Sequence, residues 1–431
     1  MNTLALRGAR LIDPESGLDE RGDLLIQDGK IAALGKHIFD TGLSDDIQTI
    51  DADGLILAPG LIDMRVVTGE PGAEHKETLA SAGLAAAAGG VTSMVVMPQT
   101  NPVIDDISLV NYIRQRGHET SPVRVYSAGA LTKGLKSQRM TELGLMAQAG
   151  AVMFSNGENP ITDTRLMRRI MAYSSTFNAL IAHRAIDPYL TEGACAHESD
   201  FSSRLGLSAA PALSERIMAE RDLALVELTG ARYLLDLVSS EDTLPAIQRA
   251  KARDLDVSAS VSINHLALNE LDIGDYRSFA KLDPPLRAES DRTALLRAVN
   301  DGTIDVIVSA HDPRPAGEKR RPFSEASSGA VGLELLLSAG LTLIADGQLD
   351  LTAFLRAVTC NPADLLGLEQ GRLRIGAPAD IVLIDQHKPW MCDVGKLRSI
   401  SRNTPFDERH MQGKTAMTIC NGKIVFDSAV N

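Results

Sequence analysis

The 431-residue chain is poor in cysteine and in aromatic residues, which make up only 4% of it. Its four cysteines, Cys195, Cys360, Cys392 and Cys420, stand alone, with no C-x-x-C spacing. This scatter excludes a disulfide framework and a cysteine-based zinc site. We therefore expect reduced, buried thiols in a cytoplasmic protein.

Long apolar runs are also missing, and no stretch approaches the length that spans a membrane. The pattern of residues 1–13 predicts a strand interrupted by polar residues and not a signal peptide. Acids outnumber bases by 56 to 43, which gives a net charge of −13. An acidic surface disfavours nucleic acid and anionic membranes, so we expect neither as a partner.

Several motifs of common enzyme classes are absent. No G-x-G-x-x-G follows the first strand of the middle region, and G-x-S-x-G does not occur. The turn at Gly69–Gly72 lacks the Lys-Ser/Thr pair of a phosphate-binding loop. These absences argue against a dinucleotide fold, a serine hydrolase and a P-loop enzyme.

Both ends of the chain show the alternation typical of β-strands. Two strong hairpin signals, Asp28-Gly29 and Asn421-Gly422, each separate a pair of such runs. The runs are Leu4–Leu11, Asp23–Gln27, Lys30–Leu34, Ile381–Ile384, Ala416–Cys420 and Lys423–Phe426. We expect one composite β-sandwich domain formed by residues 1–57 and 371–431.

The middle of the chain alternates short apolar strands with helical stretches such as Leu79–Ala88 and Ala212–Leu228. The predicted strands are Leu61–Val66, Thr92–Met97, Val123–Ala130, Val152–Ser155, Ala179–Ala182, Tyr233–Leu237, Asp256–Val261 and Val306–Ser309. Eight strands separated by helices predict an α/β fold, a (β/α)8 TIM barrel, over residues 58–370. The doubly wound sheet is the competing fold.

Functional groups of such a barrel lie at the carboxyl ends of its strands. His183 and His311 stand at predicted strand ends, and His265 lies a few residues beyond another. None of the nine histidines forms an H-x-H pair. A hydrolytic zinc site needs several converging ligands, so this barrel mouth is poor in metal donors.

A set of longer motifs runs through the chain from residue 58 onward. They are Ala58-Pro59-Gly60-Leu61-Ile62-Asp63, Glu70-Pro71-Gly72-Ala73-Glu74-His75-Lys76-Glu77-Thr78, Gly89-Gly90-Val91-Thr92, Thr100-Asn101-Pro102, Leu131-Thr132-Lys133-Gly134, Pro284-Pro285-Leu286-Arg287, Val331-Gly332-Leu333-Glu334 and Asn403-Thr404-Pro405-Phe406. With them the chain resembles the dihydroorotase family of the amidohydrolase superfamily, of the type that pairs with aspartate carbamoyltransferase. The resemblance implies an amidohydrolase-type barrel.

The departures from this family pattern fall on functional positions. By resemblance, the places of metal ligands hold Arg65, Val67, Asn156 and Leu237, and the place of the catalytic aspartate holds Ala310. The places of substrate-binding residues hold Gly69, Gln99, Asp283 and Arg314. Among the metal ligands only His183 keeps its place, and His311 matches the histidine beside the lost aspartate.

Each departure has a chemical meaning. Val67 and Leu237 offer no lone pair, and Asn156 is a neutral, weaker ligand. The guanidinium of Arg65 stays protonated and would repel Zn²⁺. Ala310 cannot take a proton from an attacking water. We therefore expect no catalytic residue and no bound cofactor, with zinc present only if the site functions unexpectedly.

The charged residues of the mouth allow two interpretations. In the first, Arg65 replaces the charge of the metal and pairs with Asp283, Asp236 or Asp312, where strand alternation turns Asp236 away from the lumen.

In the second, Arg65, Arg184 and Arg314 draw an anionic ligand into the mouth. Mutual pairing of these arginines with Asp283 and Asp312 is the alternative.

The resemblance predicts a homo-oligomeric, non-catalytic dihydroorotase-like protein of pyrimidine biosynthesis, a structural or regulatory partner of aspartate carbamoyltransferase. The alternative is an active dihydroorotase or related cyclic-amide hydrolase with an atypical metal centre. A metal-free acid/base pair of His183 and His311 would be a further variant of that alternative. The segment 188–211 is expected to be a loop over the mouth or part of an interface.

Overall fold

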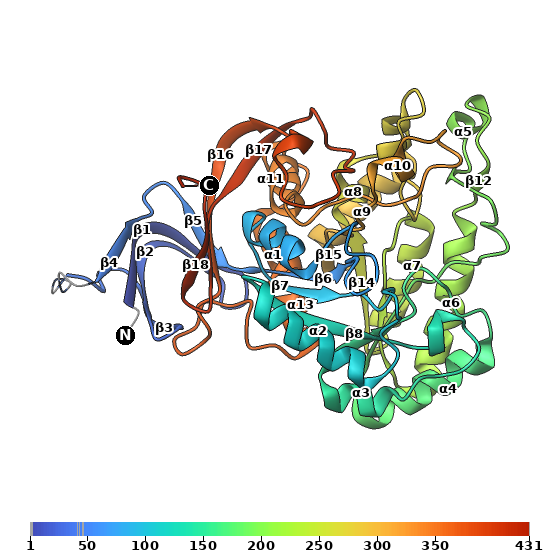
Figure 1. Ribbon diagram of the computed structural model, residues 1–431, viewed down its shortest axis with the longest axis horizontal. Coiled ribbons are helices and arrows are strands. Elements are labelled where there is room, and N and C mark those ends of the chain that lie inside the picture. Colours follow the sequence, from blue (N-terminus) through green and yellow to red (C-terminus); the bar gives the residue numbers. More distant parts are fainter. Residues whose placement is uncertain (1–2, 41, 43, 45–46, 431) are drawn as a thin grey trace.

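A computed structural model describes residues 3–40, 42, 44 and 47–430 of the chain. Residues 1 and 2 of the expected N-terminal strand therefore lie outside the described residues. Two large sheets dominate the fold, one built from both ends of the chain and one from its middle (Figure 1). Within the described part of the chain, no helix combines the length and the apolar character needed to cross a bilayer.

The terminal sheet has the strand order β18-β17-β16-β5-β1-β2-β3, with β4 paired to β1. Its strands are β1 (Thr3–Asp13), β2 (Leu18–Gln27), β3 (Lys30–Gly35), β4 (Gln48–Asp51), β5 (Ile56–Pro59), β16 (Ile381–Met391), β17 (His410–Cys420) and β18 (Lys423–Asp427). Apolar side chains from both ends of the chain share one core, among them Leu11, Ile26 and Leu383. The two termini thus form a single β unit, as the alternating runs predict.

Both predicted hairpins are present. Gln27 pairs with Lys30 across the first turn, and Cys420 pairs with Lys423 across the second. The two central residues of each turn have positive φ, 50° and 78° at Asp28-Gly29, 52° and 73° at Asn421-Gly422. This is the type I′ geometry, which asparagine, aspartate and glycine adopt at little cost.

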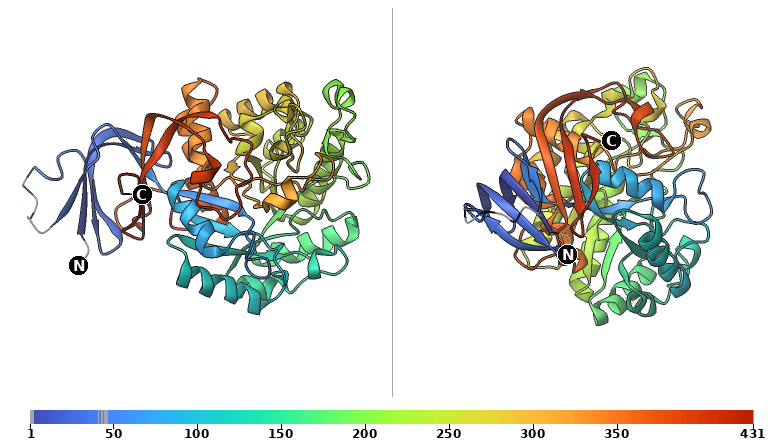
Figure 2. Two further views of the ribbon diagram at one scale, coloured as in Figure 1. Left: turned by 45° about the horizontal axis from the view of Figure 1, so that its top comes forward. Right: turned by 60° about the vertical axis from the view of Figure 1, so that its left-hand side comes forward.

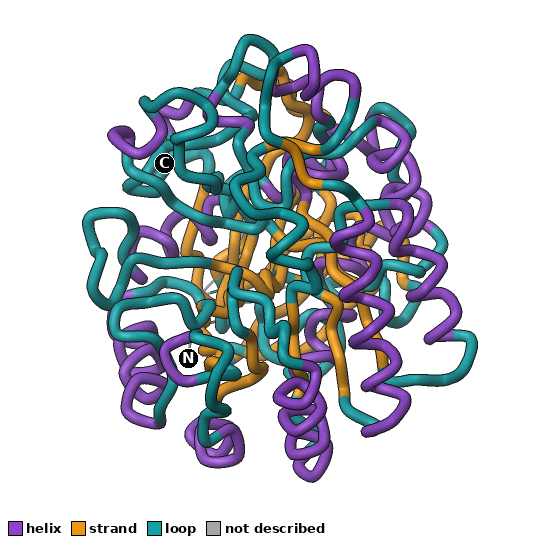
Figure 3. Tube along the Cα trace, turned by 90° about the vertical axis from the view of Figure 1, so that its right-hand side faces the viewer, coloured by secondary structure: helices purple, strands orange, loops and turns teal. Residues whose placement is uncertain are grey.

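The middle of the chain forms the predicted barrel, with parallel strands in the order β15-β14-β13-β10-β9-β8-β7-β6. Its strands are β6 (Leu61–Val66), β7 (Val91–Val96), β8 (Arg124–Ala130), β9 (Ala151–Ser155), β10 (Leu180–His183), β13 (Arg232–Leu235), β14 (Val257–Ser262) and β15 (Val306–Val308). A bridge between Val66 and His311 links the first strand to the segment after the last. Seen end-on, helices surround the strands (Figure 3).

The helices are α1 (Leu79–Ala88), α2 (Ile107–Thr120), α3 (Leu143–Ala149), α4 (Thr164–Ser174), α5 (Asp200–Arg204), α6 (Leu213–Thr229), α7 (Leu244–Lys251), α8 (Ile263–Ala267), α9 (Glu289–Asn300), α10 (Ala316–Lys319), α11 (Leu336–Ala345), α12 (Leu351–Val358) and α13 (Cys360–Leu366). Helix α1 shows why the predicted bounds hold. The Thr78 side chain accepts from the Ser81 N–H, and the helix ends before Gly89 and Gly90.

The terminal sheet lies at one side of the barrel (Figure 2). The Thr418 hydroxyl donates to the Ala87 carbonyl at 2.7 Å. Arg124, at the start of β8, pairs at 2.7 Å with the buried carboxylate of Asp380. The mouth of the barrel therefore faces away from the terminal sheet.

The segment 188–211 contains short elements of its own. Strands β11 (Ala196–His197) and β12 (Ala209–Ala210) pair in parallel, and helix α5 lies between them. Pro188, Thr191 and Cys195 line a cavity beside the barrel mouth. The segment thus lies next to the mouth, at the place expected for a loop that covers it.

Candidate functional site: the barrel mouth

The centre of the mouth holds a buried ion pair. Arg65, on β6, donates its Nε–H to Asp236 Oδ2 at 2.9 Å, and both side chains are about 95% buried, with exposed fractions of 5% and 4%. Ser260 donates to the other carboxylate oxygen at 2.9 Å. Arg65 therefore has a carboxylate partner, as the first interpretation of the sequence requires.

The expected orientation of Asp236 is wrong. Strand β13 ends at Leu235, so strand alternation no longer governs the next residue. Leu237 has a φ of 58°, in the left-handed region. The chain turns sharply after the strand, and Asp236 reaches Arg65 instead of facing away.

His183, which by resemblance stands at a metal-ligand position of the family, has both ring nitrogens engaged by protein groups. Nδ1 lies 2.8 Å from Asp222 Oδ2, and Nε2 accepts the Ile161 N–H at 2.9 Å. Because Nε2 accepts a hydrogen bond, the ring proton of the neutral imidazole is on Nδ1. Nδ1 therefore donates to Asp222. No lone pair of this imidazole remains for a metal.

Asp222 is the anchor of this network. Tyr233 donates to it at 2.7 Å, and Arg221 pairs with its other oxygen. Burial alone would raise the pKa of the Asp222 carboxyl. The charge and hydrogen bond of His183, together with Arg221, overcome that effect and lower the pKa.

His311 points toward Glu77. Its Nδ1 accepts from the Gly332 N–H at 3.2 Å, and its Nε2 lies 3.5 Å from Glu77 Oε2. Its neighbour Ala310 has a φ of 49° and carries no functional group. Ala310, Val67 and Leu237 all pack in or against the apolar cluster that fills the barrel.

Asn156 serves as a structural cross-link. Its Oδ1 accepts from the Thr132 hydroxyl at 2.7 Å. Its Nδ2 donates to the Asn159 carbonyl at 2.8 Å and to the Ser137 hydroxyl at 3.0 Å. These bonds hold the loops after β8 and β9 together, so the amide is not presented to a ligand.

The backbone of the loop after β6 packs closely around Gly69. A Cβ atom at this residue would lie 1.9 Å from the Ala73 carbonyl oxygen, so the backbone leaves no room for a side chain. The Gln99 side chain lies against Gly157. A Cβ atom added to Gly157 would lie 2.6 Å from the Oε1 atom of Gln99. Neither polar atom of the Gln99 amide has a partner among the described residues.

The remaining arginines of the mouth are paired with acids. Arg184 forms two hydrogen bonds with Asp283, and Arg314 pairs with Asp312 at 2.7 Å. Mutual pairing, the alternative to an anion-binding mouth, is therefore what these side chains do. Arg314 also donates to the Ser328 carbonyl at 2.8 Å, which fixes its position.

One acid of the mouth, Glu158, was not singled out from the sequence. It lines the central cavity together with Arg65 and Asp312. Burial, followed by the charges of Asp312 and Asp283, raises the pKa of its carboxyl. Its position two residues after Asn156, in the loop after a barrel strand, is the signal that could have identified it.

Asp222 was also missed. It stands on the buried face of α6 among Ala219, Leu225 and Val226. A carboxylate on an apolar helix face needs a partner, and that requirement was the available signal.

The space left at the centre of the mouth is about 20 Å³, lined by Arg65, Leu237, Ala310 and Glu158 among others. Such a space accommodates roughly one water molecule. A second cavity of about 310 Å³ lies beside it, between Arg184, Asp283 and the segment 188–211.

The residues of the mouth do not fit a zinc ion. Within residues 3–430, as far as the structure describes them, no three His, Cys, Asp or Glu side chains are grouped to hold a metal. His183 has no free lone pair, and the Arg65 guanidinium occupies the centre with its counter-ion. Among the described residues, the site therefore lacks the converging donors that a zinc ion requires.

Comparison with known proteins places the chain in a family. A model described as "Dihydro-orotase-like" matches residues 54–243, and one described as "Amidohydrolase family" matches residues 238–425. The dihydroorotase of Syntrophus aciditrophicus is 37% identical over 423 residues, covering 98% of this chain and 99% of that protein. The dihydroorotase of Geobacter metallireducens is 38% identical with the same coverage.

Solved structures share the fold. The L-hydantoinase of Arthrobacter aurescens has a TM-score of 0.90 and 23% identity, with 99% of this chain and 96% of that chain covered. The dihydropyrimidinase of Brevibacillus agri has a TM-score of 0.85 and 20% identity, with coverages of 99% and 95%. The fold is thus that of the amidohydrolases, and by full-length identity of 37–38% to named relatives the chain belongs to the dihydroorotase family.

Proposed function

We propose that this chain is a non-hydrolysing member of its family, which acts in pyrimidine biosynthesis as a structural or regulatory partner of aspartate carbamoyltransferase. The observation that carries the proposal is the buried ion pair of Arg65 and Asp236 at the centre of the mouth. It stands where the resemblance puts a metal ligand, and it leaves about 20 Å³ of free space.

Substrate binding would require this ion pair to open. Small-molecule sites usually enclose about 300–1,000 Å³, far more than the central cavity offers. Separating a buried ion pair leaves two uncompensated charges and costs about 3–5 kcal/mol. The apolar neighbours Leu237 and Ala310 supply no compensating bond.

The test is metal content and turnover of the full chain. We expect zinc far below one equivalent after growth in zinc-supplemented medium, and no hydrolysis of dihydroorotate above the blank. The dihydroorotase of Syntrophus aciditrophicus, prepared and assayed in parallel, is the positive control. Stoichiometric zinc together with turnover would refute the proposal.

The partner in this proposal rests on the resemblance. We expect the chain to co-elute in size-exclusion chromatography with the aspartate carbamoyltransferase of its own organism at micromolar concentration. Separate elution at that concentration would count against the partnership. A cytoplasmic location fits the four buried free cysteines.

The second candidate is an active hydrolase of dihydroorotate or a related cyclic amide. The relatives that favour it are named dihydroorotase and match along the whole chain. A metal-free pair of His183 and His311 gains no support, because both nitrogens of His183 are already bonded. Turnover in the assay above, with or without zinc, would establish this candidate.

A further inference from the structure

A basic cleft lies outside the barrel mouth, between the second half of α2, the start of β8 and the β17–β18 turn. Its volume is about 790 Å³, larger than either cavity of the mouth. The cleft follows the seam between the barrel and the terminal sheet. This size suits a small molecule such as a nucleotide.

The charge of the cleft is opposite to that of the chain. Four basic side chains, Arg114, His118, Arg124 and Lys423, line it, and no aspartate or glutamate is among its lining residues. The whole chain carries a net charge of −13. Bases gathered in a concave surface focus a positive potential that the overall charge does not reveal.

Two of these bases, Arg114 and Lys423, keep their charge free for a ligand. Arg124 is neutralised by Asp380 at 2.7 Å. Arg114 donates only to the Ala149 carbonyl, at 2.6 Å. No residue that the structure describes forms an ion pair with Arg114, His118 or Lys423, and all three are exposed.

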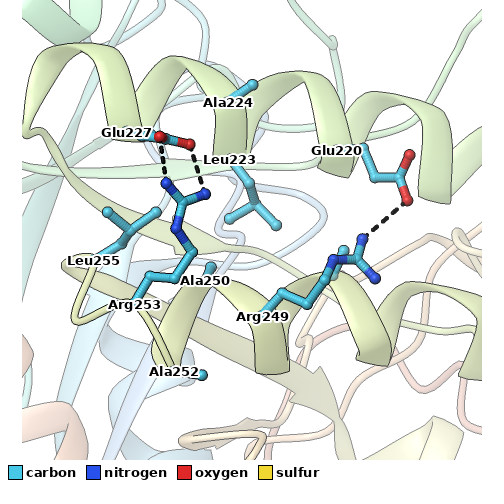
Figure 4. Close-up of a pocket in the computed structure, with 10 residues that line it drawn as sticks. Glu220, Leu223, Ala224, Glu227, Arg249, Ala250, Ala252, Arg253 and Leu255 are labelled. Carbon is cyan, nitrogen blue, oxygen red and sulfur yellow. Dashed lines mark hydrogen bonds and ion pairs between the residues drawn. The ribbon is translucent and has the colours of Figure 1, made fainter.

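A second surface groove shows the contrast. The groove between α6 and α7, of about 510 Å³, carries two arginines on one rim and two glutamates on the other (Figure 4). Glu220 pairs with Arg249 at 3.2 Å, and Glu227 pairs with Arg253. Its charges cancel across the groove, whereas those of the basic cleft do not.

The walls of the basic cleft are held in place. Asp380, which is 1% exposed, accepts from Arg124 and also from the Asn421 N–H at 2.6 Å. Arg124 donates in turn to Asn421 Oδ1 at 3.2 Å. This network fixes the β17–β18 turn against β8, so binding there requires little rearrangement.

From these features we infer that the basic cleft binds a phosphate-bearing small molecule of nucleotide size. Arg114 and Lys423 would contact the phosphate groups, since both side chains donate charge-assisted hydrogen bonds to phosphate oxygens. Pro122, Val125 and Val425 supply an apolar wall for the rest of the ligand. The site is separate from the barrel mouth and independent of the proposed partner role.

Isothermal titration calorimetry on the full chain tests the inference, with tripolyphosphate and magnesium-free ATP as probes and adenosine as the uncharged comparison. We expect both phosphates to bind at one site per chain and adenosine to show no binding. Raising the salt from about 50 to about 200 mM KCl should weaken binding severalfold, because the contacts are ionic. Absence of binding by both phosphates at the lower salt would overturn the inference.

Charge-removing variants locate the site. Arg114→Gln with Lys423→Gln should weaken both phosphates by about tenfold or more. Arg168→Gln with Arg169→Gln is the matched control, since these exposed arginines of α4 remove the same charge away from the cleft. Lys423→Gln alone, at an exposed position beside a turn, is the second variant and should weaken binding severalfold. Equal affinity of the wild type and the cleft variants would overturn the inference.

Discussion

At the scale of single residues, Asp63 is a carboxylate held where its charge is unfavourable. It is fully buried on β6, and its Oδ2 has no partner among the described residues. Burial raises the pKa of this carboxyl to about 6, against the lowering effect of bonds from Ser309 and Arg65. The folded state therefore keeps the proton over a pH range in which the unfolded chain has lost it.

The raised pKa of Asp63 makes the stability of the fold decrease as pH rises. Between about pH 4 and pH 6, rising pH ionises Asp63 in the unfolded chain first, so stability falls, and above pH 6 the loss is constant. We expect Asp63→Asn to gain up to about 3 kcal/mol over the wild type at pH 7.5 and much less at pH 4.5. Urea unfolding at both pH values measures this, with the exposed Asp346→Asn as control. A gain that did not change with pH would contradict the argument.

The ion pair of Arg65 and Asp236 predicts a strongly non-additive mutant cycle. Arg65→Met or Asp236→Leu alone leaves one charge buried without its partner and should cost about 3–5 kcal/mol. The double variant removes both charges and should recover most of that loss. Urea unfolding of the four proteins measures the cycle. Additive losses would mean that the two side chains do not interact.

The sequence predicted the composition of the mouth and offered Asp236 among three possible partners of Arg65, but it could not choose between them. The motifs around residue 63 fixed the register that put Arg65 in the mouth. Its partner depended on the backbone turn at Leu237, where a φ of 58° has no marker such as glycine. The bonds of His183 involve Ile161 and Asp222, which lie in distant parts of the sequence.

At the scale of elements, helix α2 depends on the capping residue that precedes it. Asp106 caps it by accepting from the N–H groups of Ser108 at 2.8 Å and Leu109 at 3.2 Å. Asp106→Ala should cost about 1 kcal/mol in urea unfolding, since two N–H groups lose their acceptor. Asp106→Asn, which caps equally well, should cost almost nothing. Equal losses in both variants would show that charge, not capping, is what matters.

The eight barrel strands were predictable because each is a short apolar run between helices. Strands β4 and β5 were not predicted, since they follow a polar stretch and are four residues long. Strands β11 and β12 have two residues each and depend on two pairings, Ala196 with Ala209 and His197 with Ala210, that no local pattern encodes. The hydrophobic periodicity of the sequence cannot predict elements that form only through tertiary contacts.

At the scale of the whole molecule, the terminal sheet and the barrel share buried contacts. We propose that residues 1–57 and 371–431 form one domain and residues 58–370 the other, with the first boundary inside β5 (Ile56–Pro59). The pair of Arg124 and Asp380 joins them through a carboxylate that is 1% exposed. Such coupling makes the two units depend on each other.

We therefore expect one calorimetric unfolding transition for the full chain. Asp380→Asn should move that single transition down by about 3 °C, because a chain of this length loses roughly 1 °C per kcal/mol. Lys36→Gln, at an exposed pair with Glu20 within the terminal sheet, is the control and should leave the midpoint unchanged. Two separate peaks would show that the units unfold independently.

The filled barrel mouth also restricts which substitutions the protein tolerates there. Replacing Arg65 with histidine removes the guanidinium and leaves the buried carboxylate of Asp236 without its partner. Replacing Ala310 with an acid adds a fourth acidic side chain to Glu158, Asp283 and Asp312. Each of these single substitutions should therefore lower the stability of the fold. Because Arg65 and Asp236 stabilise each other, the residue present at one position limits which residues the protein tolerates at the other.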